Sequence, residues 1–192
     1  YQLGINLIRI NDTAGARAAL ERSLELSENL VRAHYFLGVI ALEAEEPDRA
    51  ITHLERYIQV RPDDPEGKRM LANAQARRGD FTQALGLFVQ QLNSPEVQPK
   101  DHLVASYAAL RAGNAAQAEA LLPPDGAPIF SALLLAMARQ AQGQPFQPML
   151  EALDTVEGDI NMELDTHLRD LLYSFGRIPT GEALLDTVKG FE

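Results

Sequence analysis

The stretch that decides the fold is residues 33–62, which read AHYFLGVIALEAEEPDRAITHLERYIQVRP. Two segments with apolar residues at helical spacing flank a polar turn at Glu46-Pro47-Asp48, and Pro47 suits the first position of a helix. Pro62 then requires a new element to begin, because proline cannot continue the helix that precedes it. The stretch therefore predicts one helical hairpin that ends near residue 62.

The same pattern recurs every 34 residues over the first two thirds of the chain. Small residues at fixed positions let two helices approach closely, and a large apolar residue fills the space between them. Such a repeat predicts a stack of hairpins in which each one packs on its neighbours. The columns are Leu3, Leu37, Leu71 and Ala105; Gly4, Gly38, Ala72 and Ser106; Ala16, Ala50, Ala84 and Ala118; and Leu20, Leu54, Phe88 and Leu122, and Gly79 and Gly113 share the same step.

The run from Leu37-Gly38 through Ala50 and Leu54 to Pro62 resembles a tetratricopeptide repeat. The resemblance implies an all-α fold, a right-handed α-solenoid of antiparallel helix hairpins. It departs from the family where a bulky aromatic residue is usual, because His34, Lys68 and His102 stand there, and the third repeat lacks the closing proline. The four repeats span residues 1–30, 31–64, 65–98 and 99–127.

Residues 128–192 continue the pattern less regularly. Glycines at 143 and 176 predict helix ends, and Asp12 or Thr13 and Asp80 predict helix N-caps in the earlier repeats. We interpret residues 128–192 as two divergent helical hairpins that extend the stack, and we expect the sequence to be part of a larger bacterial protein with further repeats before Tyr1. The predicted helices are 128–142, 146–156, 162–175 and 179–189.

Composition excludes several classes of function. The net charge of −10 disfavours a nucleic-acid partner, since phosphate contacts need a basic face. The absence of cysteine excludes disulfides and thiol catalysis. No apolar run approaches the roughly 18 residues of a membrane span, so we expect no direct membrane insertion. A soluble chain of this kind fits either the cytoplasm or the periplasm.

In the resembled family, the first helix of each repeat lines a concave groove that holds a peptide or a partner helix. Carried over to this sequence, the lining is rich in arginine and tyrosine, with Glu43 as its one acid. We therefore predict a protein or peptide partner that presents acidic residues or a free C-terminus. In the alternative, the arginines are solvated or pair with nearby glutamates. The predicted partner-binding residues are Arg32, Tyr35, Val39, Arg69, Asn73, Arg77, Leu103, Tyr107 and Arg111.

One sharper version of this function is excluded. Some family members hold the C-terminal tails of chaperones through a two-carboxylate clamp of lysine and asparagine. In this sequence the corresponding positions do not carry those residue types, so a chaperone-tail adaptor is not expected. The residues found there are Tyr1, Ile5, Phe36, Glu66 and Met70.

No constellation of residues predicts catalysis, a metal ion or a cofactor. The four histidines are dispersed in the sequence and without partners, and His34 and His102 stand where the resembled family packs a bulky side chain. The acidic alternation over 159–165 has the spacing of a calcium loop, but Leu164 stands where such a loop needs glycine. We interpret this stretch as an acidic helix start, and the whole acidic segment 151–170 as a solvated face rather than a contact site for a basic partner.

The leading function is therefore a non-catalytic scaffold for protein–protein interaction. Two alternatives stay open. The chain could be the substrate-recognition or regulatory arm of an enzyme whose catalytic domain lies outside this sequence, or a scaffold that forms homo-oligomers. The flanking sequence would decide the first alternative, and light scattering across concentration the second.

Overall fold

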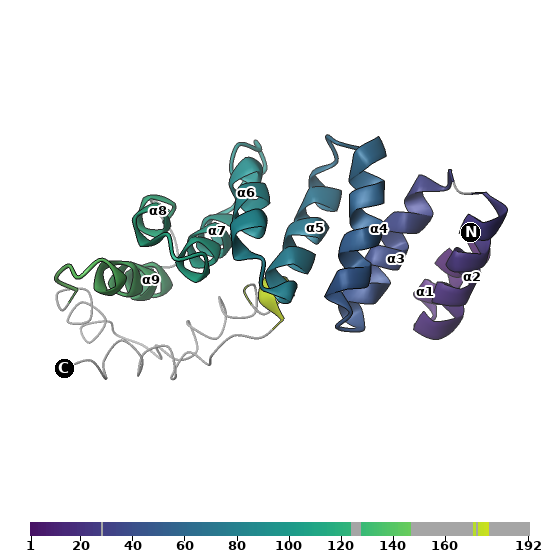
Figure 1. Cartoon of the computed structure of the whole chain (residues 1–192), viewed down its shortest axis with the longest axis horizontal. Helices are drawn as coiled ribbons and strands as arrows, with labels where there is room; N and C mark the ends of the chain where they lie inside the picture. Colours follow the sequence, from purple (N-terminus) through teal and green to yellow (C-terminus); the bar gives the residue numbers. More distant parts are fainter. Residues whose placement is uncertain (28, 124–127, 147–170, 172, 177–192) are drawn as a thin grey trace. The chain divides into compact units, whose positions relative to one another are not determined.

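The computed structural model describes residues 1–27, 29–123, 128–146, 171 and 173–176, and its regular elements in these residues are all α-helices (Figure 1). This confirms the predicted all-α fold. The chain divides into an N-terminal unit, residues 1–78, and a C-terminal unit, residues 79–192. The division falls within the third predicted repeat, 65–98, and each unit is described by itself.

The N-terminal unit is a row of helices in which each packs against the next, and the third also contacts the fifth. In Figure 1 these helices run from purple to blue. Their order confirms the sequential helix pairs that the repeat pattern predicts. The described helices are α1 (Gln2–Arg9), α2 (Thr13–Leu26), α3 (Val31–Glu43), α4 (Pro47–Val60) and α5 (Pro65–Arg78).

In the C-terminal unit, α8 packs against both α7 and α9, and α7 also contacts α9. The helix α9 matches the predicted helix at 128–142. The predicted helices at 146–156 and 179–189, and most of the one at 162–175, lie outside the described residues, as does the acidic segment at 151–170. The described helices are α6 (Phe81–Gln91), α7 (Pro99–Arg111), α8 (Ala115–Ala120) and α9 (Pro128–Ala141).

The glycine and alanine positions of the repeat bring the two helices of a hairpin close together. A Cβ atom added at Gly38 would lie 2.5 Å from Cγ of Leu54, and one added at Gly4 would lie 2.7 Å from Cγ of Leu20. Those distances are too short for a real contact, so only glycine lets α3 and α1 approach their partner helices this closely. The alanine column is fully buried throughout, at Ala16, Ala50, Ala84 and Ala118.

The turn after each first helix repeats as well. A residue with positive φ stands at Asn11 (61°), Glu45 (57°), Gly79 (100°) and Gly113 (77°), at the same 34-residue step. Glycine adopts this conformation without steric cost, whereas it is uncommon for other residues. The backbone geometry of the turn is therefore conserved along the chain even where the residue is Glu45.

The predicted helix caps are confirmed in part. Asp12 caps α2, because its Oδ1 accepts a hydrogen bond from the Gly15 N–H at 2.9 Å. Asp80 occupies the N-cap position of α6, but its side chain makes no capping hydrogen bond. Asn114 caps α8 by accepting from the Gln117 N–H at 3.2 Å.

Candidate functional site

The first candidate surface is the face of α3 that carries Arg32, Tyr35 and Val39. Arg32 is exposed and makes no ion pair among the described residues, while Tyr35 and Val39 are half-buried. The Tyr35 ring stands edge-on to Phe36, with centroids 5.4 Å apart, and packs against Tyr57 at 5.2 Å. The helix therefore presents a fixed aromatic ring, that of Tyr35, one helical turn away from the exposed guanidinium of Arg32.

On α5, Arg69 is held by Glu66 of the same helix. Its Nη2 lies 2.7 and 2.6 Å from the two carboxylate oxygens, and its Nε lies 3.0 Å from Oε2. The Tyr35 hydroxyl also donates to Glu66 Oε1 at 3.5 Å. The expectation that Glu43 is the one acid of this surface is therefore wrong, because Glu66 lies between Arg69 and Tyr35. Here the alternative interpretation, in which a predicted binding arginine pairs with a nearby glutamate, describes the structure.

Arg77, the other predicted arginine of α5, has a structural contact. Its Nη1 donates to the backbone oxygen of Leu42 at 2.9 Å, and the residue is half-buried. Carbonyl groups in the last turn of a helix have no partner within the helix, so a cationic donor there stabilises the helix end. Arg77 thus fastens α5 to the end of α3.

Three of the predicted lining residues are buried in this structure. Asn73 is 1 % exposed, Leu103 is 2 % exposed and Tyr107 is 2 % exposed. Tyr107 is covered by Phe175, whose ring stands edge-on to it with centroids 5.0 Å apart. The prediction that these side chains line an accessible surface is wrong for the described conformation. Their position on a first helix is as predicted, but a side chain packed in the core cannot contact a partner.

Arg111 lies at the end of α7 in the C-terminal unit and is exposed. Its guanidinium carbon stands 4.4 Å from the centroid of the Phe81 ring, and its Nη1 donates to the Tyr107 hydroxyl at 3.4 Å. A guanidinium over an aromatic ring keeps its outer N–H groups available while the ring fixes its position. Arg111 is therefore the predicted binding residue of this unit that remains accessible.

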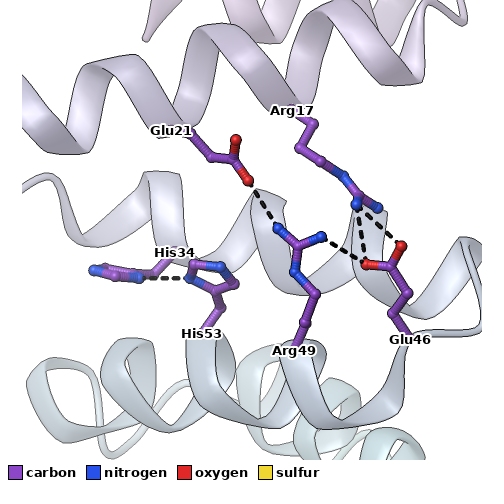
Figure 2. Close-up of polar contacts among 6 residues, drawn as sticks. All are labelled: Arg17, Glu21, His34, Glu46, Arg49 and His53. Carbon is purple, nitrogen blue, oxygen red and sulfur yellow. Dashed lines mark hydrogen bonds and ion pairs between the residues drawn. The ribbon is translucent and has the colours of Figure 1, made fainter.

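Figure 2 shows a second surface, where α2 meets α4 through ion pairs. Arg17 Nη1 lies 3.0 Å from both carboxylate oxygens of Glu46. Arg49 bridges two acids, with Nη1 3.1 Å from Glu46 Oε2 and Nη2 2.9 Å from Glu21 Oε1. The hydrogen bond from Arg17 lowers the pKa of Glu46 below its ordinary value, against the opposing effect of desolvation. These charges join the second helices of two successive repeats.

Beside these ion pairs lies a contact between two histidines (Figure 2). Nδ1 of His34 on α3 lies 3.0 Å from Nδ1 of His53 on α4, and the ring centroids are 5.3 Å apart. One neutral imidazole can donate its N–H to the lone pair of the other. The expectation that the histidines have no partners is therefore wrong for this pair.

The pair favours its neutral form. Burial lowers the pKa of His34, and the charge of Arg56 lowers it further. Burial also lowers the pKa of His53, followed by the charges of His34 and Arg49, while Glu21 acts in the opposite direction. Protonating the accepting ring would remove the lone pair that receives the hydrogen bond, and protonating either ring would place a new positive charge among arginines.

The repeat pattern holds the signal that reveals this pair. His34 and His53 are 19 residues apart, as are His102 and Leu121, which stand two repeats further along. His102 Nδ1 lies 3.1 Å from the Leu121 backbone oxygen. The two positions thus meet in both hairpins, and a histidine at each of them in the second repeat predicts their contact.

An open pocket of about 500 Å³ adjoins His34. The end of α2, the start of α3 and the last turns of α4 form its walls. Its polar lining is Asn29, His34, Arg56 and Gln59. Among the described residues, its ionisable lining groups are His34 and Arg56, and neither is an acid.

The described residues contain no group of three or more histidine, cysteine, aspartate or glutamate residues that could hold a metal ion. Among them, none of the helices has both the length and the apolar content that a membrane span requires. The candidate surfaces are therefore the α3 face, the exposed end of α7 and the His34 pocket.

Comparison with known proteins supports the repeat assignment. The tetratricopeptide repeat family model matches residues 1–65 and 40–92. Two solved structures are similar, each with a TM-score of 0.68. One, "Crystal structure of MamA", is 14 % identical, with 87 % of this chain and 97 % of that chain covered. The other, "Crystal structure of MamA protein", is 15 % identical, with 93 % and 95 % covered.

At such identities the structural likeness shows a shared fold. No curated protein sequence matches the chain. The family model covers residues 1–92, and the described helices follow the 34-residue repeat beyond them. Residues 1–92 therefore consist of tetratricopeptide repeats.

Proposed function

We propose that the chain is a non-catalytic protein-interaction scaffold that binds an acidic peptide or partner helix through the first helices of its repeats. The family assignment supports protein binding in general. The observation that carries the finer proposal is the α3 face, where exposed Arg32 stands beside the fixed ring of Tyr35. An arginine can bind a carboxylate through two parallel hydrogen bonds, and a tyrosine supplies rigid contact area.

The residues of this surface differ in how much they can contribute. Arg32 has no acidic partner among the described residues to release before it binds a carboxylate, whereas Arg69 must exchange Glu66 for the partner. Exchange of one exposed ion pair for another yields little free energy. We therefore assign the main charge contact to Arg32 and the main apolar contact to Tyr35 and Val39. In the C-terminal unit, Arg111 supplies a separate contact for a carboxylate.

The experiment compares Arg32→Glu with Arg22→Glu. Arg22 is exposed on α2, a second helix, so its substitution changes the net charge equally on a different face. The probe is an array of peptides with aspartate or glutamate around one apolar residue, each with a free or an amidated C-terminus. We expect Arg32→Glu to lower affinity at least about tenfold, the loss of a charge-assisted contact, and Arg22→Glu to change it little.

Two results would count against the proposal. One is equal binding of wild type and Arg32→Glu to every peptide that the wild type holds. The other is preferential binding of basic peptides. Comparison of free and amidated C-termini then shows whether the recognised carboxylate is terminal or belongs to a side chain.

A further inference from the structure

The His34 pocket is separate from the surface proposed above. None of its lining residues is among those expected to line the peptide groove. Its polar groups are the Arg56 guanidinium, the His34 imidazole and two side-chain amides, and no carboxylate of the described residues lines it. In a chain with a net charge of −10, a pocket that carries basic groups and no acid among its described lining residues favours an anionic ligand.

Arg56 is the group of this pocket best suited to bind an anion, because its guanidinium is always charged. It is exposed on α4 and makes no ion pair among the described residues. Arg49, two turns earlier on the same helix, is held by Glu21 and Glu46 at 2.9 and 3.1 Å. A guanidinium without such partners can present its planar fork to an incoming carboxylate without first breaking an ion pair.

His34 adds a group whose charge can follow the ligand. Its Nδ1 faces His53, so its Nε2 lies on the opposite side of the ring (Figure 2). Arg56 disfavours protonation of His34 because both would be cations. An anion bound at Arg56 reverses that effect. Binding of an anion should therefore be coupled to proton uptake by the histidine pair.

We propose that the His34 pocket is a second binding site, which takes a carboxylate group of an acidic protein segment on Arg56 and His34. The apolar part of the lining, Leu24, Val31 and Val60, suits the carbon chain that carries such a carboxylate. The pocket is independent of the α3 face around Arg32. A substitution that abolishes binding at the pocket should leave binding at the α3 face intact.

The surroundings of the histidine pair select an anion rather than a metal ion. Two imidazole nitrogens 3.0 Å apart have a spacing that a single cation could bridge. Among the described residues, the charged groups that face the pair are mostly cationic, and the acid that faces it, Glu21, is already bound to Arg49. A divalent cation would meet net repulsion there, whereas a carboxylate is attracted. These groups are Arg17 and Glu21 on α2, and Arg49 and Arg56 on α4.

The first experiment is calorimetric titration with a tetraglutamate peptide, acetylated and amidated so that only side-chain carboxylates are present. Tetraglutamine is the neutral control peptide. Arg56→Gln removes the proposed contact, and Arg61→Gln is the matched variant. Arg61 is exposed at the end of the same helix and lies outside the pocket lining, so its substitution changes the net charge by the same amount.

At pH 6 we expect tetraglutamate to bind and tetraglutamine not to bind. Arg56→Gln should weaken binding about tenfold, and Arg61→Gln by less than about twofold. Equal weakening by both variants would mean a diffuse charge effect and would overturn the proposal, as would the absence of tetraglutamate binding. Because Arg56 is exposed, Arg56→Gln is expected to fold, which circular dichroism checks.

The second experiment tests His34 and the kind of anion. Affinity for tetraglutamate should rise as pH falls from 8 to 6, and His34→Gln should remove that dependence. The His34 imidazole resonance should titrate at higher pH with peptide than without it. An affinity independent of pH in the wild type would overturn the role of His34. Inorganic phosphate that binds more tightly than tetraglutamate, with the same sensitivity to Arg56→Gln, would overturn the carboxylate assignment.

Discussion

The second and fourth repeats share one sequence pattern but hold their helices together differently. In α3–α4, Gly38 leaves room for the side chain of Leu54, which is fully buried against it. In α7–α8, Ser106 occupies the glycine position, and its Oγ donates to the Ala118 backbone oxygen at 2.8 Å. One hairpin is thus closed by apolar fit and the other by a buried hydrogen bond.

The second helix differs as well. α4 has 14 residues and carries Leu54 in its interior, whereas α8 has 6 residues and ends before Leu122. Leu122 is only half-buried, and the fourth repeat instead packs its Tyr107 against Phe175 from far along the chain. The comparison predicts that equivalent repeat positions contribute unequally to the free energy of unfolding. Substitutions at these positions test this prediction.

The largest effect is expected for Leu54→Ala. Truncation of a fully buried leucine leaves a cavity and should lower the free energy of unfolding of the N-terminal unit by about 3 kcal/mol. Leu122→Ala, at the same repeat position, should lower that of the C-terminal unit by less, about 1 kcal/mol, because the side chain is only half-buried. Denaturant unfolding, fitted with one transition for each unit, measures both; similar losses would refute the comparison.

The next effect is a pair of glycine substitutions with opposite signs. In Gly38→Ala the new Cβ would lie 2.5 Å from Leu54 Cγ, and overpacking of this kind costs about 1–3 kcal/mol. Gly86 lies inside α6 with nothing within 4 Å of a Cβ, so Gly86→Ala should stabilise its helix by about 0.5–1 kcal/mol. Thermal unfolding of the two variants gives the signs. A stabilising Gly38→Ala would show that α3 and α4 can separate without cost.

A smaller loss is expected for Ser106→Ala. The substitution removes the hydrogen bond to Ala118, and one buried hydrogen bond contributes about 1 kcal/mol. Thr52→Ala is the control, because the Thr52 hydroxyl donates to a carbonyl of its own helix on an exposed face. That variant should change the free energy of unfolding by less than about 0.5 kcal/mol. If Ser106→Ala also left stability unchanged, the fourth repeat would be held by its apolar contacts alone.

Sequence periodicity predicts the contacts that recur in each hairpin. The 34-residue step places Leu20, Leu54 and Phe88 in the core, and each is buried. It cannot place Leu122, because α8 ends at Ala120 and position 122 therefore lies beyond the helix. It also does not predict the positive φ of Glu45, because the fold imposes the left-handed conformation there on a residue that does not favour it.

The candidate site is harder to predict for a related reason. The resemblance predicts which side of a first helix would face a partner, and on α3 that side carries Arg32 and Tyr35. It does not tell which segments cover that side, and Tyr107 is buried because Phe175 packs on it from outside the repeat pattern. Leu3 and Leu37 show the same dependence on neighbours. Leu37 is 3 % exposed in a cluster with Ala16 and Leu20, whereas Leu3 on α1 is 63 % exposed.

The smallest expected effect is a pH dependence of stability that the second repeat has, because it carries the His34–His53 pair, and the fourth repeat lacks. His34 and His53 titrate below their ordinary value of about 6.5 in the folded chain. The unfolded chain therefore binds more protons between that value and the lower folded pKa values. The neutral histidine pair therefore contributes its full stability to the folded state above about pH 6.5, and this contribution is lost as pH falls through the folded pKa values.

The N-terminal transition should therefore weaken on acidification from pH 8 to 5. His53→Gln should flatten that dependence, since one of the two coupled groups is gone. His102→Gln, at the His34 position of the fourth repeat, should leave the N-terminal transition unaffected because it lies in the other unit. Denaturant midpoints at four pH values give the slopes. Equal slopes in wild type and His53→Gln would show that acid acts through carboxylates alone, and that the imidazole contact contributes nothing to holding α3 against α4.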